Sequence, residues 1–179
     1  ATKTRLLIFS EGKYREDLVE LFGARSLTNL VAKREESIDF EDLIVTTRKI
    51  VTGDIFGLEK YFIWGVSPLV VRVQHAAQKP AVVDLASEFA RNIGVNDRFV
   101  ERLCIVADEF VTNAIYNAPT TSAGEPRYAS TPRNIKVSLE PSEEVEVKLC
   151  CDGRRLGISV SDPFGSLSVD TLLDYLAKC

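Results

Sequence analysis

Alternation of apolar and polar residues in the last third of the chain is the feature that most restricts its fold. Apolar side chains fall on every second position in three segments, at 135–139, 145–149 and 156–160. A period of two is typical of β-strands that bury one face. Asp152 and Gly153 separate the last two segments, and this pair is a strong signal for a tight hairpin turn. We therefore predict three antiparallel strands.

Two helices are predicted before these strands. The first opens at a Lys-Pro pair that includes Pro80, carries an apolar face and ends at Gly94. Asn96 or Asp97 then caps a longer helix, which ends at Ala118 because a proline follows. Helices with one apolar face next to half-buried strands favour a sheet covered by helices.

These patterns place one domain at residues 68–179. It begins with a strand at 69–73 and closes with a short amphipathic helix at 169–177, and residues 120–132 are a loop by composition. Residues 58–67 form a connector. The predicted fold class is α/β: a two-layer α/β sandwich with a mixed, largely antiparallel sheet and helices on one face, plus a small N-terminal strand-helix-strand-helix segment.

The N-terminal segment spans residues 1–57, and its order of elements favours parallel strands. Gly53 stops its last helix. The segment resembles the second half of a response-regulator receiver domain, with Lys33 at the strand end where receivers keep a phosphate-contacting lysine. The acidic cluster and phosphoacceptor aspartate of a receiver have no counterpart here, so no phosphate transfer onto the segment is implied, and a solvent-facing lysine is the alternative. The expected strands are at 4–9 and 27–32, and the expected helices are at 14–22 and 40–50.

Charge and composition exclude several partners. The net charge is −4 with a pI near 5.2, and the basic residues are scattered singly, so we expect no nucleic-acid partner. No run approaches the roughly 20 apolar residues that cross a bilayer, and the start does not resemble a secretory signal, so we expect no membrane partner and a cytoplasmic protein. The cysteines lack metal-ligand spacing and are expected to be reduced thiols: Cys104, Cys150, Cys151 and Cys179.

The second predicted helix carries an unusual polar face. Asp, Asn and Thr are poor residues for a helix interior and cost up to about 0.7 kcal/mol each relative to Ala. Two interpretations stay open: an ordinary solvated face, or a site where a carboxylate and an amide one turn apart bind Mg²⁺ and orient a water. Six residues form this stripe, which lacks Lys and Arg: Asp108, Glu109, Thr112, Asn113, Tyr116 and Asn117.

Two sequence segments resemble motifs of one family. The stretch DEFVTNAIYNA resembles the asparagine box of the Bergerat-type ATP-binding domain, which histidine kinases and anti-sigma-factor kinases share. The later stretch LGISVSDPFG resembles the first glycine box of that family, an aspartate directly after a buried strand followed by glycine. The two segments occur in the family's order and are separated by a hairpin, as its topology requires.

This resemblance implies a role for each matching residue. It makes Asn113 a Mg²⁺ ligand, Glu109 the catalytic base or water-orienting group, and Asp162 the carboxylate that accepts the adenine amino group. It also implies that Asn117 faces the phosphates and that Gly165 allows the backbone to approach the nucleotide closely. The implied cofactors are ATP and Mg²⁺.

The sequence departs from the family pattern in two respects. Phe164 stands where the family's glycine box has its first glycine, and residues 1–179 contain no second glycine box or lid. An aspartate before a proline is also a common turn former, which is the structural alternative for Asp162. The single histidine, His75, is not placed on a dimerisation helix, so the anti-sigma type of kinase fits better than the histidine kinase.

We therefore expect a signal-transduction protein, related to two-component systems, whose ATP- and Mg²⁺-binding domain acts as a regulatory protein kinase on a protein signalling partner. The alternative is a non-catalytic interaction module that keeps the fold and binds nucleotide weakly or not at all. A third alternative is an unrelated small α/β enzyme that uses Cys150 or Cys151. Monomer and homodimer are both compatible with the sequence.

Overall fold

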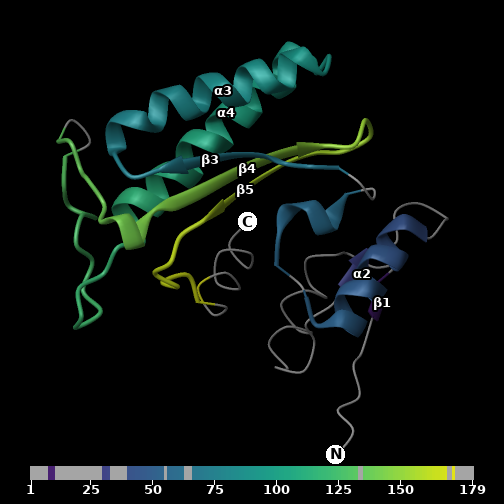
Figure 1. Cartoon of the computed structure of the whole chain (residues 1–179), viewed down its shortest axis with the longest axis horizontal. Helices are drawn as coiled ribbons and strands as arrows, with labels where there is room; N and C mark the ends of the chain where they lie inside the picture. The colour runs from purple at the N-terminus through teal and green to yellow at the C-terminus, as the bar shows by residue number, and fades with distance from the viewer. Residues whose placement is uncertain are drawn as a thin grey trace, which may run out of the picture. The chain divides into compact units, whose positions relative to one another are not determined.

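The chain forms two compact units (Figure 1). The first combines Ala1–Ile63 with Leu167–Cys179, and the second is Trp64–Ser166. The second unit contains every residue of the candidate site. The computed structural model describes residues 8–10, 30–32, 40–54, 56–62, 66–132, 135–168 and 171.

The second unit is built on a three-stranded antiparallel sheet in the order β3-β4-β5. Its strands are β3 (Leu69–Val73), β4 (Val145–Cys151) and β5 (Leu156–Ser161). Every second residue of β4 is buried, from Val145 to Leu149, as the period-two pattern predicts. The predicted hairpin turn follows, with Gly153 at a positive φ of 86°.

The predicted strand at 135–139 is wrong as an element of the sheet. Only Ser138 forms a bridge there, to His75 just beyond β3. Two backbone hydrogen bonds flank this bridge, from the Ala76 N–H to the Val137 carbonyl at 2.9 Å and from the Leu139 N–H to the Gln74 carbonyl at 2.8 Å, so the segment pairs just beyond β3 without forming a strand. Val137 and Leu139 are 4% and 5% exposed, so the alternation correctly indicated burial.

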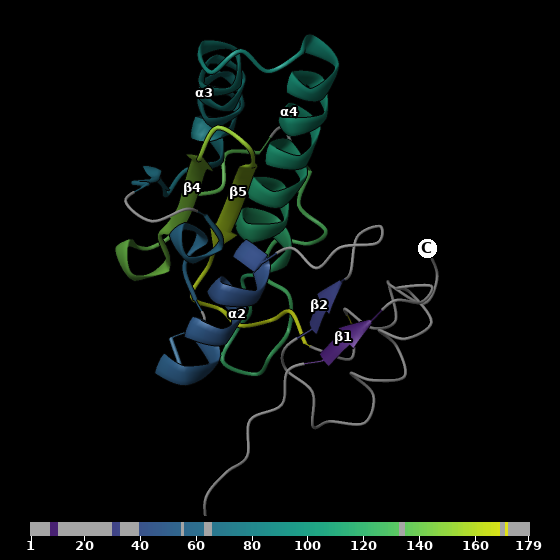
Figure 2. The same ribbon diagram turned by 90° about the vertical axis from the view of Figure 1, so that its right-hand side faces the viewer.

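Two helices cover one face of this sheet, as predicted (Figures 1 and 2). Helix α3 (Lys79–Asn92) is followed by Gly94 at a φ of 80°. Helix α4 (Asp97–Thr112) is capped by Asn96, whose side chain accepts a hydrogen bond from the backbone N–H of Arg98 at 2.9 Å. The apolar sides of the helices and sheet form the core.

The second helix changes its winding at the asparagine motif. Residues Asn113–Asn117 form a π-helical turn, η3, in which the N–H of Ala118 donates to the carbonyl of Asn113 at 2.8 Å. π-Helical turns are rare and often lie at functional sites. On its inner side this turn buries Ala114, Ile115 and Tyr116.

The described part of the first unit agrees with the predicted parallel pairing. Strand β1 (Ile8–Ser10) pairs in parallel with β2 (Leu30–Ala32), and both overlap the strands expected at 4–9 and 27–32. Helix α2 (Phe40–Thr52) ends at Gly53 as predicted, and a short 3-10 helix, η1 (Leu58–Tyr61), lies in the predicted connector. The helix expected at 14–22 and Lys33 lie outside the described residues, and of 169–177 only Thr171 is described, in helical conformation. No helix among the described residues is long and apolar enough to cross a bilayer.

Candidate functional site

Three polar side chains of the asparagine motif share one exposed side of α4 and η3. Glu109, Asn113 and Asn117, here called the asparagine row, follow one another at intervals of four residues and are all exposed. The Asn117 amide donates to the Asn113 side-chain oxygen, and these atoms are 2.6 Å apart. This bond orients the Asn113 amide so that its oxygen faces along the row. The oxygen retains a second lone pair for a ligand.

The Glu109 carboxylate is the uncompensated charge of this row. Among the residues that the structure describes, none forms an ion pair or a hydrogen bond with its side chain. Glu109 stands one turn before Asn113, so the row carries a carboxylate and an amide oxygen, the hard oxygen donors that Mg²⁺ prefers. Mg²⁺ usually takes one or two protein ligands and completes its shell with phosphate and water, so the row fits that ion.

A lysine of the neighbouring helix compensates the other acid of the stripe. The Lys79 ammonium, at the start of α3, lies 2.7 Å from a carboxylate oxygen of Asp108 and donates to the Thr112 hydroxyl at 3.2 Å. The stripe lacks basic residues in sequence, yet two of its members face a cation in the structure. Asp108 and Thr112 therefore bind α3 rather than stand open to a ligand.

Tyr116 does not belong to the exposed stripe, and its assignment to that stripe was wrong. Its side chain is buried, with 3% exposure, and packs in the core. Its hydroxyl donates to the carbonyl of Ile135 at 3.3 Å. Burial of the apolar ring is favourable, and the hydroxyl still has a hydrogen-bond acceptor at the edge of the core.

Asp162 directly follows β5, as the glycine-box resemblance requires. By the two-residue period of the strand it belongs to the face of Ile158 and Val160, which pack against the core beneath α4 and η3. One carboxylate oxygen accepts from the backbone N–H of Phe164 at 2.9 Å and closes a turn. The other oxygen is left for a different donor. Both interpretations of Asp162, turn former and adenine acceptor, therefore stay compatible.

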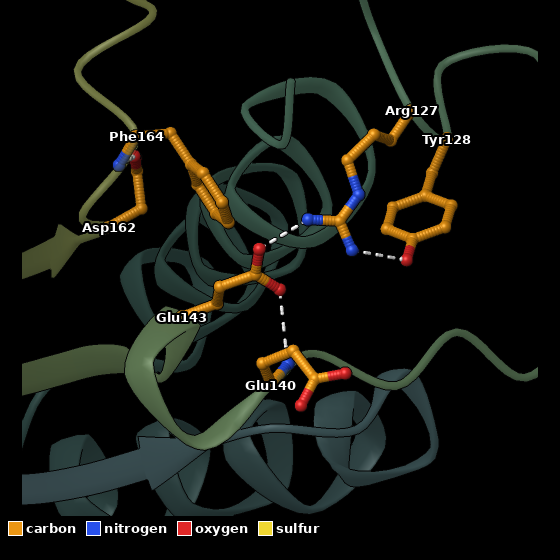
Figure 3. A network of polar contacts seen from close by, with 6 residues as sticks. All are labelled: Arg127, Tyr128, Glu140, Glu143, Asp162 and Phe164. Atoms are coloured by element: carbon orange, nitrogen blue, oxygen red, sulfur yellow. Dashed lines mark hydrogen bonds and ion pairs between the residues drawn. The ribbon is translucent and has the colours of Figure 1, made fainter. Parts of the chain in front are cut away.

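The residues after Asp162 give the rim of the site its shape. Phe164 packs against the main core cluster, and Figure 3 shows its ring beside Glu143. Gly165 has a φ of 63°, a conformation that side-chain-bearing residues rarely adopt, and a Cβ there would meet no atom within 4 Å. The backbone thus favours glycine at this position, and the absence of a side chain leaves the outer side of the turn open.

A polar cluster that sequence reasoning missed lies next to this turn (Figure 3). The Arg127 guanidinium forms an ion pair with Glu143 and donates to the Tyr128 hydroxyl at 2.7 Å. Glu143 also accepts from the backbone N–H of Glu140 at 3.1 Å. Arg127, Tyr128, Glu140 and Glu143, here called the Arg127 cluster, fasten the loop at 120–132 to the 3-10 turn Pro141–Glu143.

The charges of Arg127 and Glu143 stabilise each other within the Arg127 cluster. The hydrogen bond from Arg127 lowers the pKa of Glu143, and the Glu140 N–H lowers it further. The hydrogen bond to Glu143 raises the pKa of Arg127. The only sequence signal was the Glu-x-x-Glu spacing of Glu140 and Glu143, which is typical of a capped turn, whereas nothing in the sequence indicated Arg127 as the partner.

Among the described residues, the remaining candidates are not arranged as a reactive centre. Cys104, Cys150 and Cys151 are free thiols, and Cys150 is buried at 1% exposure. The described residues contain no group of three or more His, Cys, Asp and Glu side chains that could hold a metal ion. His75 contacts the Ser138 hydroxyl through Nδ1 at 3.0 Å, a cross-strand contact that follows from their bridge.

Comparison of the chain with protein-family models, with curated proteins and with solved structures found no match. The interpretation of the site therefore depends on the geometry of its own residues.

Proposed function

We propose that the second unit binds an adenine nucleotide with Mg²⁺ and acts as a regulatory protein kinase of the anti-sigma-factor type. The observation that supports this most is the asparagine row, because an exposed carboxylate stands one turn before a rare π-helical turn whose first and last residues are the two hydrogen-bonded asparagines. Asp162 adds a second polar group on the helix-facing side of the sheet. Together they supply the acceptor for adenine and the oxygen donors for the metal.

In this proposal each residue has one chemical task. Asn113 holds Mg²⁺ through its side-chain oxygen, and Asn117 keeps that amide in its orientation. Mg²⁺ supplies the neutralisation of phosphate charge when it is bound. Glu109 accepts the proton of the hydroxyl that attacks the terminal phosphate, and adenosine diphosphate leaves with the electron pair of the broken bond.

The adenine contact is tested with Asp162→Asn. The amide oxygen can still accept from the Phe164 N–H, so the turn is kept, but the NH₂ group would face the adenine amino group as a second donor. We expect binding of a fluorescent ATP analogue to weaken at least about tenfold, or about 1.4 kcal/mol. Asp152→Asn is the matched control, because Asp152 also accepts backbone N–H groups in a turn of the hairpin. Equal binding by both variants would contradict the proposed adenine contact.

The metal contact is tested with Asn113→Ala. Binding of the analogue should lose its dependence on Mg²⁺, while binding without Mg²⁺ should change little, because only the metal ligand is removed. Asn92→Ala, at the exposed end of α3, is the control for loss of a helical asparagine. A variant that keeps the full Mg²⁺ dependence would exclude Asn113 as a ligand.

The non-catalytic interaction module is a second candidate, supported by exposed apolar side chains on α4. Phe99, Ile105 and Phe110 are 59%, 63% and 45% exposed. Large apolar groups at a surface often mark contacts with a partner. Absence of analogue binding by the wild-type chain, with and without Mg²⁺, would favour this module over the kinase.

A further inference from the structure

The positive charge of Lys79 is not stabilised by the dipole of its own helix. Lys79 is the first residue of α3, and the N-terminus of a helix carries a partial positive charge that disfavours a cation. Its ammonium instead reaches across to α4, to Asp108 at 2.7 Å and to Thr112 at 3.2 Å. One side chain thus joins the start of α3 to two successive turns of α4.

The two acceptors directly precede the residues of the asparagine row. Asp108 adjoins Glu109, and Thr112, the last residue of α4, adjoins Asn113. The Lys79 side chain is 28% exposed, so solvent and salt screen this pair less than a fully exposed one. Displacement of either acceptor would also move its neighbour, because a planar peptide bond joins adjacent residues.

We propose that Lys79 is a positioning residue that holds the end of α4, and thereby the Glu109 and Asn113 side chains, in place for Mg²⁺ and nucleotide. This inference rests on the proposed function. Lys79 acts through Asp108 and Thr112 and does not touch the ligand. Its cation also offsets the charge of Asp108, so of the two acids of the stripe only Glu109 has no ionic partner among the described residues.

The test compares Lys79→Met and Lys79→Arg in the full chain with two measurements. Hydrogen exchange of the amides at 113–118 reports how firmly the π-helical turn is held. Titration of a fluorescent ATP analogue at several Mg²⁺ concentrations reports the affinity of the site and its dependence on Mg²⁺. Lys79→Met should speed the exchange and weaken Mg²⁺-dependent binding about fivefold, within the range of coupling between contacting residues. Lys79→Arg keeps a cation and should restore both to within about twofold of wild type.

Lys148→Met is the matched control. The Lys148 ammonium lies 2.9 Å from Glu146, and its side chain is 22% exposed, close to the value for Lys79. It stands on β4, on the opposite side of the sheet from the residues that pack against the helices. This variant should leave both the exchange at 113–118 and the Mg²⁺ dependence unchanged.

Unchanged exchange in Lys79→Met would overturn the positioning role. Faster exchange with an unaltered Mg²⁺ dependence would limit Lys79 to stability and would also overturn it. Absence of nucleotide binding by the wild type would overturn the proposed function and the ligand-related role of Lys79 together. In that case the exchange data would still decide whether Lys79 holds the end of α4.

Discussion

The asparagine row and the Arg127 cluster are two polar groupings in the same unit with opposite character. In the Arg127 cluster, a cation and an anion face each other, and the Arg127 and Glu143 side chains are only 24% and 17% exposed. In the asparagine row, a carboxylate and two amides are exposed, and the Glu109 side chain has no ionic partner among the described residues. The charges of Arg127 and Glu143 are paired with each other, whereas no charge among the described residues pairs with Glu109.

This difference separates a structural role from the binding role that we propose. The Arg127 cluster joins a long loop to a turn, and its fixed partners stabilise both charges. The asparagine row stabilises little, because its side chains are exposed and two of its three residues are asparagines, which are poor helix formers. Exposed oxygen donors that no cation of the protein neutralises are what a metal ion needs. Four predictions sharpen or break this comparison.

The largest effect on stability is expected on the buried side of the π-helical turn. Ile115 is fully buried there, between the two asparagines in sequence. Ile115→Ala should lower the free energy of unfolding by about 2–5 kcal/mol, because it leaves a cavity in the core. Denaturant unfolding measures this, and Ile105→Ala, at an exposed position of α4, is the control. Similar losses in both variants would contradict the burial of this turn.

A smaller effect is expected in the Arg127 cluster. Glu143→Gln keeps the shape and the acceptor for the Glu140 N–H but removes the charge that faces Arg127. The free energy of unfolding should fall by about 1 kcal/mol, since the pair is partly screened by solvent. Glu144→Gln is the adjacent control, because Glu144 pairs with Arg72, whose side chain is 66% exposed. A loss of unfolding free energy in Glu144→Gln as large as that in Glu143→Gln would show that the Arg127–Glu143 pair stabilises the fold no more than an exposed ion pair does.

The same carboxylate predicts a dependence of stability on pH. The pKa of Glu143 is lowered from its usual value of 4.5 in the folded chain, so its contribution is complete above that value and is lost as the pH falls through the folded pKa. Wild type should therefore lose more stability than Glu143→Gln between neutral and acidic pH. Parallel curves of unfolding free energy against pH would contradict the assignment.

The smallest effect on stability is expected in the asparagine row. Glu109→Gln changes an exposed side chain and should alter the free energy of unfolding by less than about 0.5 kcal/mol. In the proposed kinase, the same change should reduce phosphoryl transfer at least about a hundredfold, because the general base is lost. Transfer from radiolabelled ATP and denaturant unfolding are measured on the same preparation. A stability loss like that of Glu143→Gln would remove the contrast between the two groupings.

Local patterns predicted most of the second unit. Asn96 as a cap, Gly94 as the end of α3 and the turn at Gly153 all depend on residues within a few positions of one another. The alternation that predicted β4 and β5 is local as well. The exposure of the asparagine row followed from helical spacing in the same way, whereas its role as a nucleotide site stays a prediction.

Tertiary structure decided the rest, because it depends on residues distant in sequence. The segment at 135–139 pairs through a single bridge beyond β3 and forms no strand, although its alternation resembles that of a strand. Burial of Tyr116 removed it from the polar stripe. Lys79 and Arg127 found their acidic partners on other elements, since the free energy of an ion pair depends on which charges the fold brings within a few ångströms and how far it excludes water. A single sequence shows the charges but not these distances.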